Sequence, residues 1–440
     1  MSRSKPLTML VLGATIHSAN RGVSALGLAT LANLRRAFPE ARLILANSGL
    51  ATGLSLHVGT TPFEVETSWI VPSRSLRPRS GTAYLNLLRM LRPWVPDVLH
   101  RLLSTRTFEQ LDQADVVLDI SGGDSFADTY GQRLLWSQIV VKQLALAMGK
   151  PLVLLPQSLG PFASGQSSRA ACRILRRSLL VASRDVGGVE QMEQLVGSDV
   201  RPRLASCPDV AFTLEPLQVA PRELPECMRR VPNGPVIGLN VSGYLYSGNA
   251  NTPLSLDYKE MIDAIVQWAM SLPGSRLLLV PHVFGSPGGT NGRYATDLEA
   301  CQLVCQRHSH SSGTRIESLQ RSMGADELKC LIGRCDLFIG ARMHSCIASA
   351  SQCVPTAALA YSHKVEGVFG VIGAGSMVVD MRQATVRTIV QRIRAIFGQR
   401  EQLRRELGTR VPQAKRAVRS FFAETLRDAL RDHDITTENS

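Results

Sequence analysis

The sequence has no apolar run long enough to cross a membrane. A spanning helix needs roughly 18–20 apolar residues in a row, and no stretch of the 440 residues approaches that. The apolar start, residues 7–16, lacks the cleavage-site pattern of a signal peptide. Aromatic residues make up only 5% of the chain, and no helix-turn-helix, zinc-finger or aromatic RNA-binding pattern is present. We therefore expect a cytoplasmic protein with no nucleic-acid partner.

Acidic residues are scarce relative to basic ones, and the formal net charge is +13. The excess lies in two stretches. Residues 74–106 hold seven arginines and one acid, and residues 382–432 hold thirteen Lys or Arg and five acids. Because no nucleic-acid motif accompanies the charge, we interpret it as a surface for anionic lipid or for a phosphorylated substrate.

A disulfide framework is not expected, because the nine cysteines are odd in number and lie mostly in apolar surroundings. One cluster suggests a metal site, formed by Cys301, Cys305, His308 and His310. Its spacing matches no standard zinc pattern, so we interpret it as helix packing and expect no metal.

What the sequence does contain is a repeated order of short apolar strand, glycine-bearing loop and amphipathic helix. In the first half we expect strands at residues 7–12, 41–46, 116–120, 151–156 and 180–184, with a helix at 23–38. In the second half we expect strands at 236–241, 276–280, 336–339 and 356–360, with helices at 257–272, 297–307, 325–332 and 344–351. This alternation predicts an α/β protein with two Rossmann-like, doubly wound domains.

A linker is expected at residues 214–235, which hold five prolines. We accordingly predict an N-terminal domain over 1–215 and a C-terminal domain over 235–385. Residues 386–432 are expected to form helices that pack back on the first domain, with a break near 408–412. Ligands of such sheets bind at the carboxyl ends of the strands, so the two domains should face a shared cleft.

Four segments that follow strands carry the chemistry, and residues 279–282 and 361–365 accompany them. The four are Ile-Ser-Gly-Gly-Asp-Ser-Phe at 120–126, Pro-Gln-Ser-Leu-Gly-Pro-Phe at 156–162, Ser-Arg-Asp at 183–185 and Gly-Ala-Arg-Met-His-Ser-Cys-Ile-Ala at 340–348. In this order and spacing they resemble the polysaccharide pyruvyl transferase family over residues 8–380. The resemblance implies a glycosyltransferase-B-like architecture and transfer of pyruvate from phosphoenolpyruvate to a sugar as a ketal. It also implies that the N-terminal domain lies on the acceptor side and the C-terminal domain on the donor side. It implies no cofactor, and an acceptor similar to a lipid-linked sugar or glycolipid at the cytoplasmic leaflet.

Arg342 and His344 are the strongest site residues. Phosphoenolpyruvate carries a carboxylate and a phosphate, which require converging cations and N–H donors. Arg342 offers a planar fork and His344 a titratable proton, beside the start of a helix. The alternative is that both residues are structural: Arg342 would pair with a nearby acid, and His344 would cap the helix. The resemblance favours Arg342 as a donor clamp and His344 as acid or proton shuttle.

Arg184 resembles a family position at which an arginine faces the donor from the other domain, although the family's serine is replaced within residues 186–189. A surface turn with Asp185 is the alternative. Gly122 and Gly123 would let a ligand approach closely. Asp124 stands where many relatives have a third glycine; it would either deprotonate an acceptor hydroxyl or cap the following segment.

The remaining predicted site residues are expected to bind substrate. They are Gln157 as a hydrogen-bonding group, Asn20 and Arg21 near the acceptor, His282 in the cleft or as a strand-end cap, and Lys364 beside phosphate. Acceptor recognition is assigned to loops such as residues 49–81 and 242–253.

Two further questions stay open at this level. Residues 81–106 alternate apolar side chains with arginines, as in a helix at a membrane interface or a helix buried against the first domain. The same architecture would also suit a nucleotide-sugar glycosyltransferase, for which Glu366 is the one candidate ribose-binding carboxylate, or a non-catalytic scaffold. Retention of Arg342, His344 and Arg184 argues against a scaffold.

Overall fold

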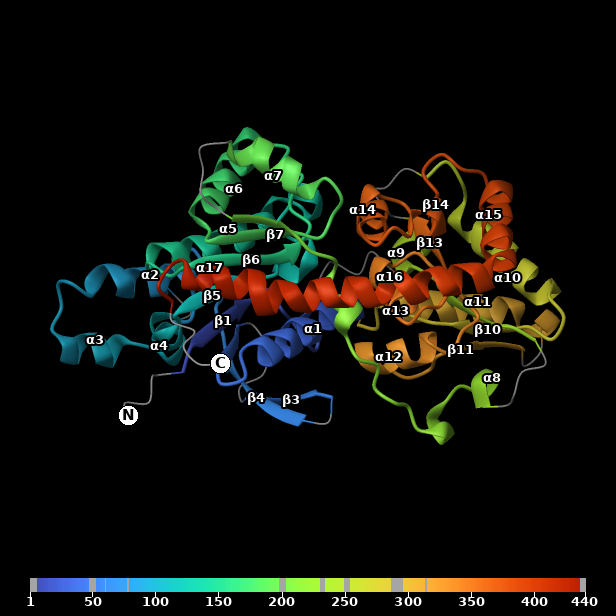
Figure 1. Cartoon of the computed structure of the whole chain (residues 1–440), viewed down its shortest axis with the longest axis horizontal. Helices are drawn as coiled ribbons and strands as arrows, with labels where there is room; N and C mark the ends of the chain where they lie inside the picture. Colours follow the sequence, from blue (N-terminus) through green and yellow to red (C-terminus); the bar gives the residue numbers. More distant parts are fainter. Residues whose placement is uncertain are drawn as a thin grey trace. The chain divides into compact units, whose positions relative to one another are not determined.

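The computed structural model describes residues 6–46, 53–59, 61–76, 79–197, 203–229, 234–248, 254–285, 296–312 and 315–435. The chain divides into two compact units, each built on a parallel sheet with helices on both faces (Figure 1). Unit 1 comprises Met1–His17, Leu26–Val210 and Ala417–Ser440, and unit 2 comprises Ser18–Ala25 and Ala211–Arg416. The predicted α/β fold with two doubly wound domains is confirmed.

The sheet of unit 1 has eight strands in the order β3-β4-β2-β1-β5-β6-β7-β8. They are β1 Thr8–Leu12, β2 Arg42–Ala46, β3 Leu54–Val58, β4 Thr61–Ser68, β5 Val116–Asp119, β6 Leu152–Gln157, β7 Leu180–Ser183 and β8 Arg203–Ser206. All neighbours are parallel except β3 and β4, which form an antiparallel edge pair. The central strands are buried along their whole length, as expected of a parallel sheet covered on both faces.

Helices cover this sheet with apolar faces. They are α1 Arg21–Ala37, α2 Thr82–Leu91, α3 Asp97–Leu103, α4 Arg106–Gln113, α5 Gln132–Ala147, α6 Gly165–Arg177, α7 Gly188–Val196 and α17 Leu426–Arg431. Leu88 of α2, Phe108 of α4 and Ile174 of α6 are fully buried in one core with the strands. This core fixes the carboxyl ends of β5, β6 and β7, where three of the predicted motifs begin.

The sheet of unit 2 has six parallel strands in the order β11-β10-β9-β12-β13-β14. They are β9 Val236–Asn240, β10 Arg276–Leu279, β11 Ile316–Ser318, β12 Leu337–Gly340, β13 Thr356–Ala360 and β14 Val378–Asp380. The helices are α8 Glu226–Arg229, α9 Gly243–Tyr246, α10 Tyr258–Ser271, α11 Asp297–Ser312, α12 Ala325–Ile332, α13 Met343–Ala350, α14 His363–Val371, α15 Val386–Gly398 and α16 Arg400–Ser420. Because β9 pairs with β12 so that Asn240 lies opposite Gly340, the residues after both strands meet at one edge.

The proline-rich stretch does not remain an open linker. Val219, Leu224 and Cys227 are buried in the core of unit 2, together with residues of β10 and α12. The C-terminal helices contribute to both units. In unit 2, Phe397 of α15 packs edge-on against Trp268, and in unit 1 Arg427 of α17 lies over the ring of Phe38.

The expected helix break near residues 408–412 is wrong, because α16 continues through Pro412. A proline inside a helix removes one N–H and crowds the carbonyl four residues earlier. That earlier residue is Gly408, whose missing side chain leaves open space around it. None of the helices in the described part of the chain is long and apolar enough to span a bilayer.

Candidate functional site

Arg342 is held at the carboxyl end of β12 by groups from two other elements. It is the N-cap residue of α13, and its backbone N–H donates to the Asn240 side-chain oxygen at 3.0 Å. Its Nε donates to both oxygens of Asp297 at 3.1 and 3.2 Å, and Nη2 donates to one of them at 2.7 Å. About 21% of the side chain remains exposed. Asp297 therefore fixes one edge of the guanidinium while part of it stays accessible.

Asp297 is the first residue of α11 and is fully buried. Besides Arg342, its carboxylate accepts hydrogen bonds from the backbone N–H groups of Gly243 at 2.9 Å and His282 at 3.2 Å. Burial would lower the pKa of Arg342, but the charge and hydrogen bonds of Asp297 raise it above its ordinary value. Arg342 thus stays cationic, and the local acid pair that the sequence left open is present.

His344 lies one residue into α13 and is half-buried. The first turn of α1 packs directly on it, since a Cβ added to Gly22 would lie 2.5 Å from the His344 Nδ1. Glycine is therefore needed at position 22 for this close approach. Asn20 caps the same turn by accepting the Gly22 N–H at 3.0 Å. The predicted residue Asn20 is thus brought next to His344.

Arg21 and His282 connect this turn to the body of unit 2. The Arg21 N–H donates to the His282 carbonyl at 2.9 Å, and its guanidinium donates at 2.6 Å to the Met323 carbonyl and to the Ser322 hydroxyl. It also lies 5.1 Å from the ring centre of Phe284, and burial lowers its pKa. Arg21 thus anchors the turn through protein contacts.

His282 is a buried imidazole beside the Arg342 cluster. Its side chain is 2% exposed, and both of its ring nitrogens lack a hydrogen-bond partner among the described residues. Burial, followed by the positive field of His344, lowers the pKa of His282 to about 3. The His282 imidazole is therefore neutral, and both of its nitrogens are buried beneath the surface of the cluster. It does not act as a strand-end cap, because neither ring nitrogen has a hydrogen-bond partner among the described residues.

Lys364 completes the predicted residues of unit 2. It is the second residue of α14, directly after β13, and is half-buried. Because β13 neighbours β12, Lys364 belongs to the same sheet edge as Arg342. Glu366, two residues further on, accepts a hydrogen bond from the Arg382 guanidinium, and its other carboxylate oxygen lies 3.0 Å from the His363 Nδ1.

In unit 1, Arg184 follows β7 and is fully buried, so it does not form the surface turn considered above. Its Nη1 donates to Asp209 at 2.6 Å and its Nε donates to the Ser158 hydroxyl at 3.1 Å. Burial would lower its pKa, but Asp209, and then Asp124 and Asp185, raise it. A Cβ on Gly123 would lie 2.8 Å from Nη1, so Arg184 lies directly under the glycine loop.

The loop after β5 has a strained backbone. Ser121, Gly122 and Gly123 all have positive φ, at 45°, 59° and 93°. The buried Lys142 of α5 supports the loop, because its ammonium donates to Ser121 Oγ at 2.8 Å and pairs with Asp119 at 3.1 Å. Burial lowers the pKa of Lys142, while Asp119 opposes that shift.

Asp124 in this loop and Gln157 at the end of β6 differ in their exposure to solvent. Asp124 is half-buried and accepts the Tyr130 hydroxyl at 2.6 Å. Gln157 is fully buried and donates to the Asp119 carbonyl at 2.9 Å, so its amide contacts protein. The predicted residues of unit 1 are thus brought together at the ends of β5, β6 and β7, with Asp124 more accessible than Gln157 or Arg184.

The described members of the cysteine–histidine cluster of α11 have other surroundings than a metal ion. His308 lies 2.8 Å from Asp263, and Cys301 is buried in the core. The side chain of His310 lies outside the described residues. Among the residues that the structure describes, no three His, Cys, Asp or Glu side chains are placed to hold a metal ion.

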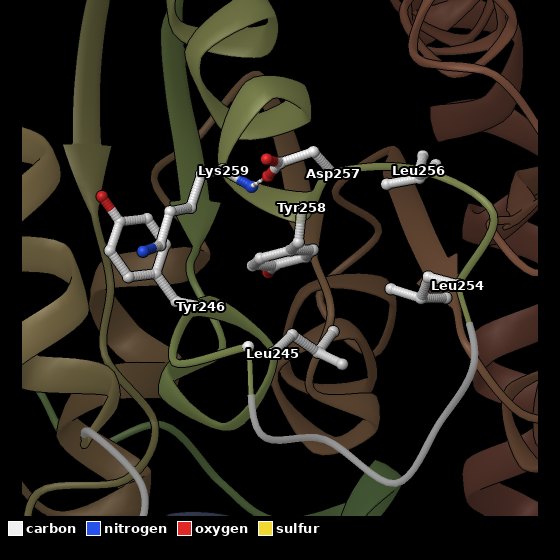
Figure 2. Close-up of a pocket in the computed structure, with 8 residues that line it drawn as sticks. Leu245, Tyr246, Leu254, Leu256, Asp257, Tyr258 and Lys259 are labelled. Carbon is white, nitrogen blue, oxygen red and sulfur yellow. Dashed lines mark hydrogen bonds between the residues drawn. The ribbon is translucent and has the colours of Figure 1, made fainter.

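Figure 2 shows a separate recess of about 350 Å³ in unit 2, lined by Leu245, Tyr246, Gly248, Leu254, Leu256, Asp257, Tyr258 and Lys259. Its polar groups have internal partners. Tyr258 accepts the Ser242 N–H at 3.1 Å, and the Lys259 ammonium lies 5.2 Å from the ring centre of Tyr246. The recess shares no residue with the Arg342 cluster.

Solved structures with a similar fold are glycosyl-transferring enzymes and their relatives. HepE from Anabaena in complex with UDP has a TM-score of 0.54 and 13% identity, over 97% of this chain and 100% of that chain. Sucrose-phosphate synthase from Thermosynechococcus elongatus has a TM-score of 0.54 and 11% identity, over 98% and 100%. At these identities the likeness shows the fold, which is glycosyltransferase-B-like as predicted.

Sequence comparison is more specific. The amylovoran biosynthesis protein AmsJ from Erwinia amylovora is 22% identical over 339 residues, which are 72% of this chain and 74% of that protein. The family model described as polysaccharide pyruvyl transferase matches residues 20–363, which include Arg342, His344, Arg184 and the glycine loop. On this match across most of its length, the chain belongs to the polysaccharide pyruvyl transferase family.

Proposed function

We propose that this protein transfers pyruvate from phosphoenolpyruvate to two hydroxyls of a sugar in a polysaccharide or glycolipid precursor, forming a cyclic ketal and releasing phosphate. The observation that carries the proposal is the Arg342–Asp297 pair beside His344 at the start of α13. It places a fixed cation, a titratable imidazole and a helix N-terminus at one sheet edge.

The donor requires such a site because it is a small dianion or trianion. Arg342 would bind its carboxylate or phosphate through the accessible part of the guanidinium, with Lys364 after the neighbouring strand adding charge. Asp297 keeps Arg342 in one orientation, so little side-chain entropy is lost when the ligand binds. His282, predicted as a substrate-binding residue, would reach the donor only after the side chains that cover its ring nitrogens move, and it would then supply a hydrogen bond without adding charge.

Ketal formation needs one proton delivered and two removed. Protonation of carbon 3 makes carbon 2 electrophilic, and the first sugar hydroxyl adds there and loses its proton. Phosphate then leaves with the electrons of its C–O bond, and the second hydroxyl adds to carbon 2 and loses its proton. We assign the first proton to His344 as general acid. Asp124, the accessible carboxylate of the glycine loop, is our candidate to accept a hydroxyl proton. Arg184 supports that loop from below.

Thermal unfolding of the purified protein with phosphoenolpyruvate, inorganic phosphate, pyruvate or UDP-glucose tests the proposal. We expect phosphoenolpyruvate to stabilise the protein most, by about 2.7 kcal/mol at a hundredfold excess over its Kd. Arg342→Ala should abolish this stabilisation. His344→Gln should keep it, while phosphate release in the presence of acceptor falls by about a hundredfold or more. A folded His344→Gln protein with normal turnover would remove His344 from the mechanism.

A nucleotide-sugar glycosyltransferase is the competing function, supported by a fold shared with HepE, which was solved with UDP. Its ribose-binding carboxylate would have to be Glu366, which Arg382 already engages. Stabilisation by UDP-glucose that is lost in Glu366→Gln, with none from phosphoenolpyruvate, would favour that function instead.

A further inference from the structure

Large hydrophobic side chains are exposed more densely around α2 and α3 than elsewhere in the described chain. Eleven such side chains are at least 36% exposed among the described residues, and six of them lie between residues 69 and 102. Four of them lie on α2, on α3 or in the turn between these helices: Trp94 at 83%, Leu102 at 74%, Met90 at 56% and Leu99 at 44% exposure. We call these four residues the α2–α3 surface. Apolar side chains gathered in this way mark a contact surface.

The spacing of the four residues places them in pairs on common helix sides. Met90 and Trp94 are four apart, and the helical turn continues to Trp94, whose N–H donates to the Leu91 carbonyl at 2.8 Å. Leu99 and Leu102 are three apart on α3. Each pair therefore forms a short apolar stripe that faces solvent.

The segment is anchored to unit 1, so its exposure is not that of a loose end. Leu85 and Leu88 of α2 are buried in the core of unit 1. The Tyr84 hydroxyl donates to the Leu103 carbonyl at 2.9 Å and ties the end of α3 to α2. In Figure 1 the two helices lie together at the margin of unit 1, away from its central strands. A buried side and an exposed apolar side coexist in α2.

The charge around these residues identifies the partner. Residues 74–106 carry seven arginines and only Asp97 as an acid. Arg74, Arg79, Arg92 and Arg106 are all exposed. Of these, Arg92 pairs with Asp112 at 2.7 Å and Arg74 lies 5.0 Å from the ring centre of Trp136. A second copy of the chain would bring the same arginines and be repelled. A lipid leaflet with anionic headgroups offers both complementary charge and an apolar layer, and tryptophan is favoured at that depth.

We propose that the α2–α3 surface docks the protein on an anionic lipid leaflet, with Trp94 and Met90 entering the headgroup region and arginines facing lipid phosphates. This inference goes beyond the proposed pyruvyl transfer and does not depend on it. Docking would bring unit 1 to the place where a lipid-linked acceptor is presented.

Cosedimentation of the full chain with vesicles tests the docking. We expect binding to phosphatidylcholine vesicles that contain phosphatidylglycerol, weak binding to pure phosphatidylcholine, and loss of binding at about 0.5 M salt. The double variant Trp94→Ser/Met90→Ser should bind about tenfold more weakly or worse, because it removes inserted apolar area and no charge. Leu303→Ser, at a side chain 51% exposed on α11, is the matched control and should bind like the wild type.

Tryptophan fluorescence provides a measurement that needs no serine variant. Anionic vesicles with brominated acyl chains should quench the wild-type emission, and Trp94→Phe should lose most of that quenching.

Wild-type chain that stays in the supernatant with anionic vesicles would overturn the proposal. Undiminished binding by the double variant would also overturn it. So would self-association of the lipid-free chain that the double variant abolishes, because the surface would then be an interface between copies.

Discussion

At the scale of single residues, Asp297 is the group whose loss should disturb most of the unit 2 cluster. It is fully buried and accepts hydrogen bonds from Arg342, Gly243 and His282. Asp297→Asn would leave the Arg342 charge without its anionic partner. The new amide N–H would also face the backbone N–H groups that now donate to the carboxylate, so donors would meet without an acceptor. We expect a loss of about 3–5 kcal/mol in the free energy of unfolding, and weaker binding of phosphoenolpyruvate in the protein that remains folded.

Asp263→Asn is the control for that substitution in urea or guanidinium unfolding. Asp263 also pairs with an arginine, Arg307 at 2.9 Å, but its side chain is 24% exposed. We expect it to cost about 1 kcal/mol or less. Equal losses in the two variants would mean that Asp297 is an ordinary ion-pair partner and not the organising group of the site.

His282 predicts a pH dependence of stability. Its pKa is about 3 in the folded protein against an ordinary value of 6.5. Between these values the unfolded chain binds a proton that the folded protein does not, so its contribution to stability is complete above pH 6.5 and falls as pH drops toward 3. The slope from this one group is at most about 1.4 kcal/mol per pH unit. His282→Asn should make the measured decline between pH 6.5 and 4 shallower. An unaltered decline in His282→Asn would contradict the buried neutral state.

At the scale of elements, the loop after β5 depends on glycine for two separate reasons, and two substitutions separate them. Gly123 and Gly131 have nearly equal φ, 93° and 90°. A Cβ on Gly123 would lie 2.5 Å from Leu26 Cδ1 and 2.8 Å from Arg184 Nη1, whereas nothing lies within 4 Å at Gly131. Gly131, with ψ at 158°, lies in a backbone region that essentially only glycine adopts, so we expect Gly131→Ala to cost about 1–3 kcal/mol from backbone strain alone. Gly123→Ala should cost about 1–3 kcal/mol more because of overpacking.

Chemical unfolding of both glycine variants measures that difference. If they lose the same stability, the close packing of Arg184 under the loop is incorrect.

Elements with a strong local pattern could be predicted from the sequence, and those defined by pairing could not. The buried strands β1, β9, β12 and β13 lie within one or two residues of their predicted bounds, because continuous apolar runs between glycine loops specify them. The edge strands β3, β8, β11 and β14, and β4 next to β3, were missed. They are short or partly exposed, so their hydrogen bonds to a neighbour define them, and a local pattern does not carry that information.

The same distinction applies to the site. Arg342 and His344 were found because they share one turn, whereas Asp297 was read only as the start of a helix. Its partner lies 45 residues away, and only the fold brings them together. Lys142 and Asp209 were missed for the same reason, since they pair with Asp119 and Arg184 from other elements. His282 was identified, but its burial and low pKa depend on packing that a single sequence does not reveal.

At the scale of the whole molecule, the formal charge of +13 predicts retention on a sulfated polyanion such as heparin, separate from docking on lipid. Heparin binds a basic protein through long-range Coulombic attraction, and this binding does not require apolar side chains that insert into a lipid layer. The basic stretches 74–106 and 382–432 both contribute, so no single arginine should dominate. Lipid docking instead needs the apolar α2–α3 surface in addition to charge.

Two variant classes should therefore separate the two kinds of binding. Trp94→Ser/Met90→Ser should elute from immobilised heparin at the wild-type salt concentration while its binding to anionic vesicles falls about tenfold. Arg79→Gln/Arg106→Gln should elute from heparin at lower salt and bind the vesicles more weakly, because both interactions use exposed charge. Unfolding midpoints equal to that of the wild type would establish that all variants are folded. If the double serine variant bound the vesicles as tightly as the wild type, attraction to the leaflet would be purely Coulombic, and Trp94 and Met90 would have no place in it.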